Sequence, residues 1–268
     1  YDLKQFRLDG YSKEVDLVKT DLSQKERILQ SIILSQYRLK VAENNKISCK
    51  PVILFKAQKE IKENKENELF FNDIIKNLKL SDLEKLKNDT KVDIVIEAFN
   101  YFEKNNIKLE LLVDELKNDF APEKCLNVNE ENIENKSIKK QDKEEVISQQ
   151  YILNSLEDKN NRIRAIFAVQ KLNEWWDVLN LFDIVRMYDD KRSVVKDKHT
   201  WKMIPWPQTI SEAQLIGRGA RYYPFTYENF TWEEKFKRKF DGSDNELKIL
   251  ETFYYHTNFN SEYISEIK

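Results

Sequence analysis

Short apolar runs alternate along the chain with longer stretches in which apolar residues recur every three or four positions. Three runs, at residues 51–56, 163–169 and 183–188, predict strands that are buried on both faces, as in parallel sheets. A weaker run at 124–128 predicts a fourth strand. The spacing between 23 and 44 predicts an amphipathic helix that begins with a capping-box pattern. This alternation is typical of an α/β fold, a parallel sheet flanked by helices.

The distance between the first two predicted strands indicates an insertion. Roughly 70 residues separate them, whereas a crossover between parallel strands needs about a dozen. We therefore expect a helical subdomain at 59–123, which leaves 1–58 and 124–268 as the two parts of the main domain. One of its helices is expected to begin at Ser81-x-x-Glu84. The predicted elements outside the insertion are an initial strand or linker at 1–20, a helix at 142–156, and a last helix that begins at Ser243-x-x-Glu246 and runs through Phe253.

Composition narrows the class of protein without identifying it. With 268 residues, 40% apolar and 34% charged, the chain can bury a substantial core, and its net charge of −2 neither requires nor excludes a nucleic-acid partner. The two cysteines and two histidines do not have the spacing of a metal site, so we expect no metal site and a reducing, cytoplasmic setting.

No apolar run approaches the ~20 residues that cross a bilayer, so no membrane partner is expected. Because the chain begins at Tyr1, we expect it to be part of a longer polypeptide.

The segment 214–221 contains the most specific polar pattern. If it is helical, Gln214, Arg218 and Arg221 share one face. Two of the four glycines, Gly217 and Gly219, flank Arg218, although glycine costs about 1 kcal/mol relative to alanine in a helix. We therefore expect a ligand to approach the backbone here. Two guanidinium groups on one face can bracket a phosphoryl group, and the alternative is a pair of surface arginines bound to carboxylates.

These segments resemble motifs of a known family. Residues 163–188, with Leu-Asn-Glu-Trp-Trp-Asp-Val-Leu-Asn at 172–180, and residues 214–221 resemble motifs V and VI of superfamily 2 helicases. The sequences of these segments are most similar to the restriction (Res) subunit of type III restriction-modification enzymes, in which motif VI reads Q-L-I-G-R-G-A-R. In this chain the motif is followed by Tyr-Tyr-Pro-Phe at 222–225. Residues 51–58 resemble the strand of motif IV. The resemblance implies the second of two RecA-like domains of an ATP-driven DNA translocase.

The resemblance also implies site residues. Gln214, Arg218 and Arg221, with Gly217 and Gly219 beside them, would face the ATP phosphates across a cleft from the first RecA-like domain. Arg221 would be the arginine finger, and Arg218 would assist it in catalysis. We expect these arginines beside the carboxyl ends of the parallel strands, where ligands of open α/β sheets bind.

Motifs V and IV imply further contacts. Asp177 would lie near the nucleotide ribose, and a turn or helix-cap role is the alternative. Asn173, for which a cap role is again the alternative, and Glu174 would link the nucleotide to DNA. Phe55 and Lys56 are candidates for contact with the DNA backbone, and a buried Phe55 with a solvated Lys56 is the alternative. The family usually has glycine where this chain has Trp175, so either this loop takes a different course or the coupling of ATP to DNA is impaired.

Several motifs of the complete family are absent from the sequence. It contains no G-x-x-x-x-G-K-[ST] and no acidic magnesium motif, so ATP and Mg²⁺ would be bound mainly by the first RecA-like domain, and this chain alone should hydrolyse ATP negligibly. Glu-x-Lys triplets recur by chance in so charged a sequence, and the family's nuclease domain lies C-terminal to the motor. The implied partners are duplex DNA, the first RecA-like and nuclease domains of the same polypeptide, and the modification methyltransferase subunit. The rival interpretations are a different superfamily 2 motor and an inactive RecA-like binding module.

Overall fold

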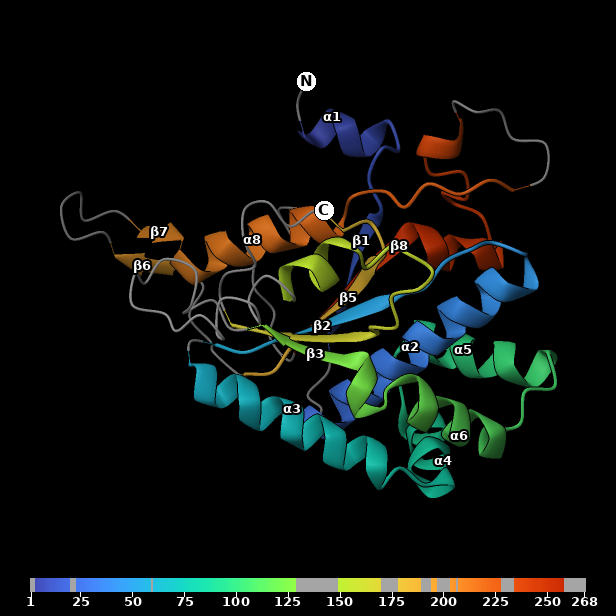
Figure 1. The fold of residues 1–268 in the computed structure, drawn as a ribbon. Helices are drawn as coiled ribbons and strands as arrows, with labels where there is room; N and C mark the ends of the chain where they lie inside the picture. Colours follow the sequence, from blue (N-terminus) through green and yellow to red (C-terminus); the bar gives the residue numbers. More distant parts are fainter. Residues whose placement is uncertain are drawn as a thin grey trace.

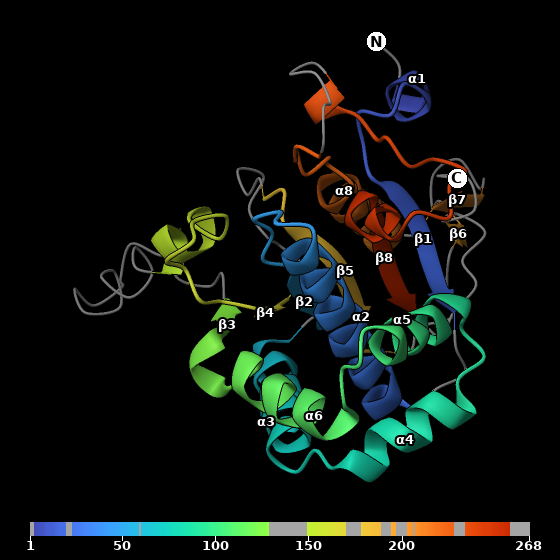
Figure 2. The ribbon, with the colours of Figure 1, turned by 90° about the vertical axis from the view of Figure 1, so that its right-hand side faces the viewer.

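Six parallel strands form the centre of the molecule, in the order β1-β8-β5-β2-β4-β3 (Figure 2). The computed structural model describes residues 3–19, 23–58, 60–128, 149–169, 178–188, 194–196, 203–205, 207–227 and 234–257. The strands of the sheet are β1 (Glu14–Lys19), β2 (Val52–Lys56), β3 (Cys125–Val128), β4 (Ala165–Ala168), β5 (Leu181–Arg186) and β8 (Thr252–Thr257). Every residue of β2, β4, β5 and β8 is buried, as the apolar runs predicted for all but β8.

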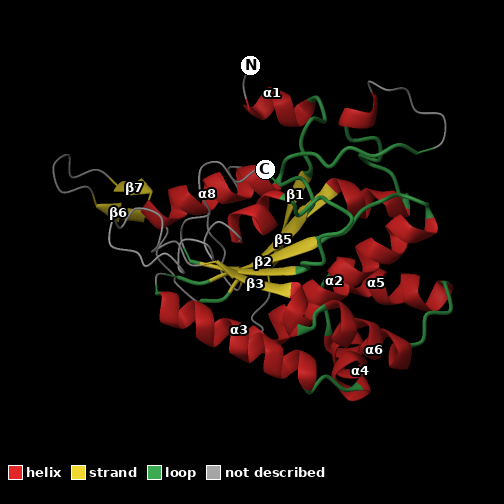
Figure 3. Cartoon of the chain, viewed as in Figure 1, coloured by secondary structure: helices red, strands yellow, loops and turns green. Residues whose placement is uncertain are grey.

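Helices cover both faces of this sheet (Figures 1 and 3). One face carries α2 (Gln24–Asn44) and the four helices that follow β2, and the other carries α8 (Pro207–Gly219) and residues 152–156. The remaining elements are α1 (Leu3–Leu8), the hairpin of β6 (Val194–Lys196) and β7 (Met203–Pro205), and the 3-10 helices η1 (Pro122–Lys124), η3 (Glu234–Phe236) and η4 (Glu246–Glu251). The predicted α/β fold is confirmed, and the parallel sheet is consistent with a RecA-like architecture.

Helix α2 is the central helix of its layer. Its N-terminus has the predicted capping box, in which the Ser23 hydroxyl accepts from the Glu26 amide at 3.3 Å and the Ser23 amide donates to the Glu26 carboxylate at 3.0 Å. Arg38, 0% exposed, extends from this helix to Asp183 of β5 at 2.6 Å, and Asp183 also contacts Nε2 of His256 in β8 at 3.0 Å. Burial opposes the charged form of Asp183, but Arg38 and His256 outweigh it and hold the pKa of this carboxyl below its ordinary value. The network joins the helix layer to two strands of the sheet.

Four helices fill the segment in which the sequence predicted a helical insertion. They are α3 (Ile61–Lys76), α4 (Leu80–Asp89), α5 (Asp93–Lys104) and α6 (Leu109–Asp119). Phe71 of α3 packs on the sheet, with its ring centroid 4.9 Å from that of Phe55 and 5.3 Å from that of Phe167. The apolar residues of all four helices belong to the same buried cluster as this face of the sheet. The helices therefore extend the main core.

Two predicted helix starts were wrong. Helix α4 begins one residue before Ser81, because the Asp82 carboxylate accepts from the Lys79 amide at 2.9 Å and caps the helix there. Near the end of the chain, Asn245 caps the short η4 in place of Ser243, and Phe253 lies in β8 rather than in a helix. The run Thr-Phe-Tyr-Tyr-His-Thr at 252–257 is rich in aromatic and β-branched residues, which favour a strand.

The predicted helix at 142–156 is helical over 149–154, and residues 141–148 lie outside the described part.

Candidate functional site: helix α8 and the carboxyl ends of β2 and β5

Helix α8 runs antiparallel to the strands on which it packs (Figure 1). Midway along the helix, the Glu212 carboxylate lies 3.2 Å from Nζ of Lys56 and 3.5 Å from Nε of Arg186, which are the last residues of β2 and β5. At its end, the carbonyl of Gly219 accepts a hydrogen bond of 2.9 Å from the side chain of Lys13, directly before β1. The helix thus begins at the carboxyl edge of the sheet and ends at its amino edge.

Exposed and buried positions alternate along residues 214–221. Gln214, Gly217 and Arg221 are exposed and Arg218 is half-buried. The buried positions are Leu215, Ile216, Gly219 and Ala220. Arg221 follows the last helical residue by two positions and pairs with Ser12 in an isolated antiparallel bridge. Gln214 and Arg218, one helical turn apart, share a face of α8, whereas Arg221 lies beyond the helix in the bridge to Ser12.

The expectation that Arg218 and Arg221 lie at the carboxyl ends of the strands is wrong. Arg218 belongs to the last turn of α8, and Arg221 follows the helix by two residues. This end of α8 lies at the amino edge of the sheet. The reason is the direction of the helix: in a crossover between parallel strands the connecting helix runs back across the sheet, so its C-terminal residues return to the edge where the strands begin. The arginines consequently lie at the edge opposite to Lys56 and Arg186.

The two glycines of the segment have different surroundings. A Cβ built on Gly219 would lie 2.3 Å from Cε2 of Phe253 in β8, far inside van der Waals contact. A Cβ on Gly217 would meet nothing within 4 Å. The structure therefore assigns Gly219 a packing function, the close approach of α8 to the sheet, in place of the expected approach of a ligand.

The carboxyl ends of β2 and β5 carry a buried polar cluster. Lys56 and Arg186 are register partners in adjacent strands and are 1% and 6% exposed. Nζ of Lys56 donates to the Tyr188 hydroxyl at 2.9 Å, and that hydroxyl donates in turn to the Glu212 carboxylate. The Arg186 guanidinium lies 4.3 Å from the centroid of the Tyr188 ring. We call Lys56, Arg186, Tyr188 and Glu212 the carboxyl-edge cluster.

The pKa values of this cluster have two opposing causes. Burial lowers the pKa of the Lys56 ammonium, and the nearby Glu212 carboxylate opposes this effect. Burial also opposes the charge on Arg186, but Glu212 outweighs it and raises the pKa of that group. The pKa of Tyr188 is raised by burial and then by Glu212, so its hydroxyl remains a hydrogen-bond donor. The Glu212 carboxylate is therefore the shared buried partner of the Lys56 and Arg186 cations and of the Tyr188 hydroxyl.

The structure corrects the predicted contact of two residues with DNA. Phe55 is 0% exposed and its ring stacks on that of Phe167, with 5.0 Å between centroids. Lys56 is as buried as Phe55, rather than solvated, because Glu212 and Tyr188 supply its partners. In this arrangement neither side chain reaches a nucleic acid.

Asn173, Glu174, Trp175 and Asp177 lie outside the described residues, so their predicted roles stay predictions.

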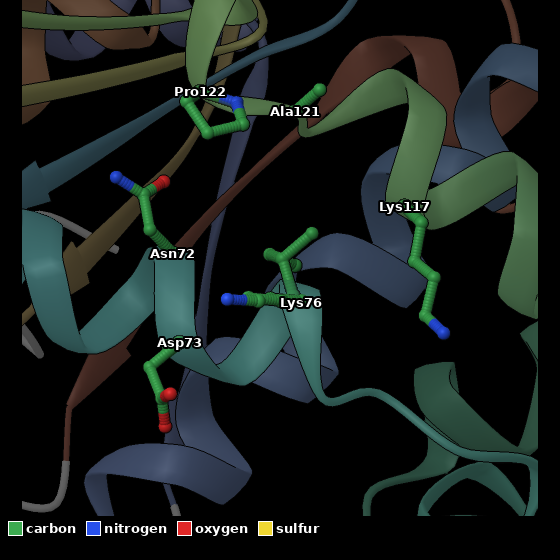
Figure 4. Close-up of a pocket in the computed structure, with 7 residues that line it drawn as sticks. Asn72, Asp73, Lys76, Lys117, Ala121 and Pro122 are labelled. Atoms are coloured by element: carbon green, nitrogen blue, oxygen red, sulfur yellow. The ribbon is translucent and has the colours of Figure 1, made fainter.

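A surface pocket of about 470 Å³ lies between α3 and the segment from α6 to η1 (Figure 4). Asn72, Asp73 and Lys76 line it from α3, opposite Ala121 and Pro122. It is on the face of the sheet opposite to α8. Among the residues that the structure describes, no group of histidine, cysteine and carboxylate side chains is arranged to hold a metal ion. No described helix is long and apolar enough to span a membrane.

Comparison with known proteins adds an independent finding. The chain is 33% identical over 215 residues to the probable type III restriction-modification enzyme HindVIP Res subunit of Haemophilus influenzae. The match covers 75% of the chain and 41% of that subunit. The chain is also 52% identical over 62 residues to an uncharacterized protein of the same organism. This second match covers 22% of the chain and 13% of that protein.

A family model covers the segment that contains α8. The HI_1054_N model, described as an N-terminal region, matches residues 208–268 of the chain. No solved structure matches the chain. The chain spans less than half of the length of the Res subunit that it resembles.

The carboxyl-edge cluster has a recognisable signal in the sequence, which was not among the predicted site features. Lys56 and Arg186 each occur near the end of an apolar run, where a buried parallel strand reaches its carboxyl edge. A cation at the same place in two strands indicates a shared counter-charge, and Glu212 follows in the next helix. Lys13 gave no comparable signal, because it precedes β1 in a mixed polar segment.

The surroundings of the two glycines predict opposite effects of alanine. Gly219→Ala should destabilise the chain by about 1–3 kcal/mol, because the new methyl group overlaps the Phe253 ring. Gly217→Ala, the matched control, should leave stability unchanged or raise it by up to about 1 kcal/mol, because the site is open and helical. Urea denaturation of the two variants measures this difference. Equal effects would show that α8 does not approach β8 as closely as described.

Removal of the shared carboxylate should cost much more than removal of an exposed one. Glu212→Gln leaves Lys56 and Arg186 buried without a counter-charge, which should lower the free energy of unfolding by about 3 kcal/mol. Glu66→Gln is the control, because Glu66 and its partner Lys62 are exposed, and it should change stability by less than about 1 kcal/mol. Denaturant titration at neutral pH compares the two. A loss below about 1 kcal/mol for Glu212→Gln would contradict the described cluster.

Proposed function

We propose that this chain is the second motor domain of an ATP-dependent type III restriction subunit. In the complete enzyme it would help to couple ATP hydrolysis to movement along duplex DNA before cleavage. The observation that carries the proposal is that Gln214, Arg218 and Arg221 are all at least partly exposed, in a chain that is 33% identical to a Res subunit over 75% of the chain's own length.

The chain would supply charge stabilisation rather than the nucleotide cradle. ATP and Mg²⁺ would be bound mainly by a first RecA-like domain, because this sequence has no phosphate-binding loop. Arg221 would reach the transferring phosphoryl group from the exposed end of α8, Arg218 would assist it, and Gln214 and Gly217 would face the same ligand. A guanidinium supplied across an interface contributes about 10³- to 10⁵-fold in rate in related phosphoryl transfers.

The amino-edge position of the arginines restricts how the two domains would meet. The rule that ligands bind at the carboxyl edge concerns a ligand held by the sheet's own domain. A nucleotide held by another domain would instead have to approach the end of α8, beside the start of β1. The proposed interface therefore includes Arg221 and the neighbouring backbone of Ser12.

DNA would be bound through residues other than Phe55 and Lys56. Asn173, Glu174 and Asp177 remain candidates for the coupling of nucleotide to DNA, on the basis of the motif V resemblance. The modification methyltransferase subunit and a C-terminal nuclease domain are the further proposed partners. These partners are inferred from the Res subunit, and the chain matches only 41% of its length.

One observation favours a second candidate, an inactive RecA-like binding module. The arginines lie at the edge away from the carboxyl-edge cluster, and the two cations of that cluster are already paired with Glu212 in the interior. Such a module would bind its partners without contributing to ATP hydrolysis. A different superfamily 2 motor would share the arginine-dependent chemistry and would lack the restriction nuclease.

The arginine of motif VI distinguishes a motor from an inactive module. In the complete subunit, Arg221→Ala should lower DNA-stimulated ATP turnover at least about 100-fold, with a smaller change in KM, because its contact forms chiefly in the transition state. Arg162→Ala, which removes an exposed arginine outside α8, is the matched control and should retain turnover. Normal turnover of the Arg221→Ala subunit would favour the inactive module.

A further inference from the structure

A buried lysine side chain joins the end of α8 to the start of β5. Lys13 is 0% exposed, and its Nζ donates hydrogen bonds to the carbonyl oxygens of Leu179 at 2.7 Å, Leu181 at 2.7 Å and Gly219 at 2.9 Å. Leu181 is the first residue of β5, and Gly219 is the last helical residue of α8. One side chain thus contacts two segments that are about 40 residues apart and belong to different elements.

The three contacts match the chemistry of an ammonium group. A protonated lysine has three N–H donors and no acceptor, and here each donor has a carbonyl. The last carbonyls of a helix lack partners within the helix, and a cation at that end is favourable. The Phe182 ring, whose centroid is 4.3 Å from Nζ, covers another side of the charge. A shorter or apolar side chain would leave buried carbonyls without a donor.

Burial of the Lys13 ammonium costs free energy, which burial of an apolar side chain at this position would not. Burial lowers the pKa of Lys13 well below its ordinary value, and Arg38 nearby lowers it further. The backbone of the same residue also holds the helix end, because the Lys13 amide donates to the Ala220 carbonyl at 2.6 Å. Immediately beyond, Ser12 pairs with Arg221. Side chain and backbone together fix the peptide that carries the proposed arginine finger.

We propose that Lys13 is a positioning residue for the motor reaction, which holds the end of α8 against β5 and so fixes the direction in which Arg221 points. This inference rests on the proposed function, because it requires Arg221 to act on the nucleotide. Leu179 and Leu181 lie within residues 163–188, the segment with the motif V resemblance, and Gly219 belongs to the segment with the motif VI resemblance. Lys13 is therefore a physical connection between the two motifs, which lie far apart in the sequence.

The test is a double-mutant cycle in the complete subunit. Lys13→Met keeps the length of the side chain and removes its donors, Arg221→Ala removes the guanidinium, and the third variant combines the two. We expect Lys13→Met to lower the DNA-stimulated kcat at least about tenfold and to change the KM for ATP less than about threefold, because a misplaced group acts in the transition state. The combined variant should be no slower than Arg221→Ala alone, because the two residues act through one contact.

A matched control separates this role from a loss of stability. The half-buried Lys50 also donates to a backbone carbonyl, that of Asn161, but does not contact α8. Lys50→Met should retain kcat within about twofold at a temperature where circular dichroism shows all variants folded. If Lys13→Met does not fold, Lys13→Gln replaces it, because the amide keeps two of the donors; its kcat should be reduced to an intermediate degree.

Each outcome has a distinct meaning. If Lys13→Met and Lys50→Met both turn over at the wild-type rate while Arg221→Ala is slow, Lys13 only stabilises the fold and the inference is overturned. Losses that multiply in the combined variant overturn it as well, because the residues then act independently. If Arg221→Ala itself is unimpaired, the proposed function fails, and the inference fails with it.

Discussion

The position of α8 depends on one buried charge and on one missing side chain at the end of the helix. The ammonium of Lys13 supplies donors to carbonyls of α8 and of the segment that begins β5, and the absence of a Cβ on Gly219 lets the same turn lie directly on Phe253. The first contact satisfies groups that would otherwise be buried unpaired, and the second sets the distance between helix and sheet. Both act on the peptide units next to Arg218 and Arg221.

Because of the direction of this helix, the carboxyl-edge cluster and Arg221 lie at opposite edges of the sheet. At the carboxyl edge, Glu212 pairs with both Lys56 and Arg186 within the interior, so these two strand-end cations are closed to solvent. At the amino edge, the segment that follows α8 presents Arg221 outward. A protein that binds its own nucleotide would use the first edge. A domain that completes the site of a neighbour can use the second, and this is the arrangement that we propose.

Much of the fold followed from local sequence signals. The buried strands correspond to apolar runs, and the capping box at Ser23 followed from the spacing of its residues. Strand β8 was missed because Leu247, Leu250 and Phe253 have helical spacing, although only the first two belong to a helical turn. The Lys56–Glu212 pair of the carboxyl-edge cluster and the contacts of Lys13 join residues more than 100 positions apart, and no local pattern specifies which partner each residue takes. The edge at which the arginines lie could have been predicted, since a crossover helix returns to the amino edge.

The most direct test of this account is an experimental structure of the complete subunit bound to Mg²⁺ and ADP with aluminium fluoride, which mimics the transferring phosphoryl group. The account predicts that the Arg221 guanidinium lies within hydrogen-bonding distance of the fluoride, roughly 3 Å, while Lys13 still contacts the carbonyls of Leu179, Leu181 and Gly219. A nucleotide at the carboxyl ends of β2 and β5, with Arg221 turned to solvent, would contradict it.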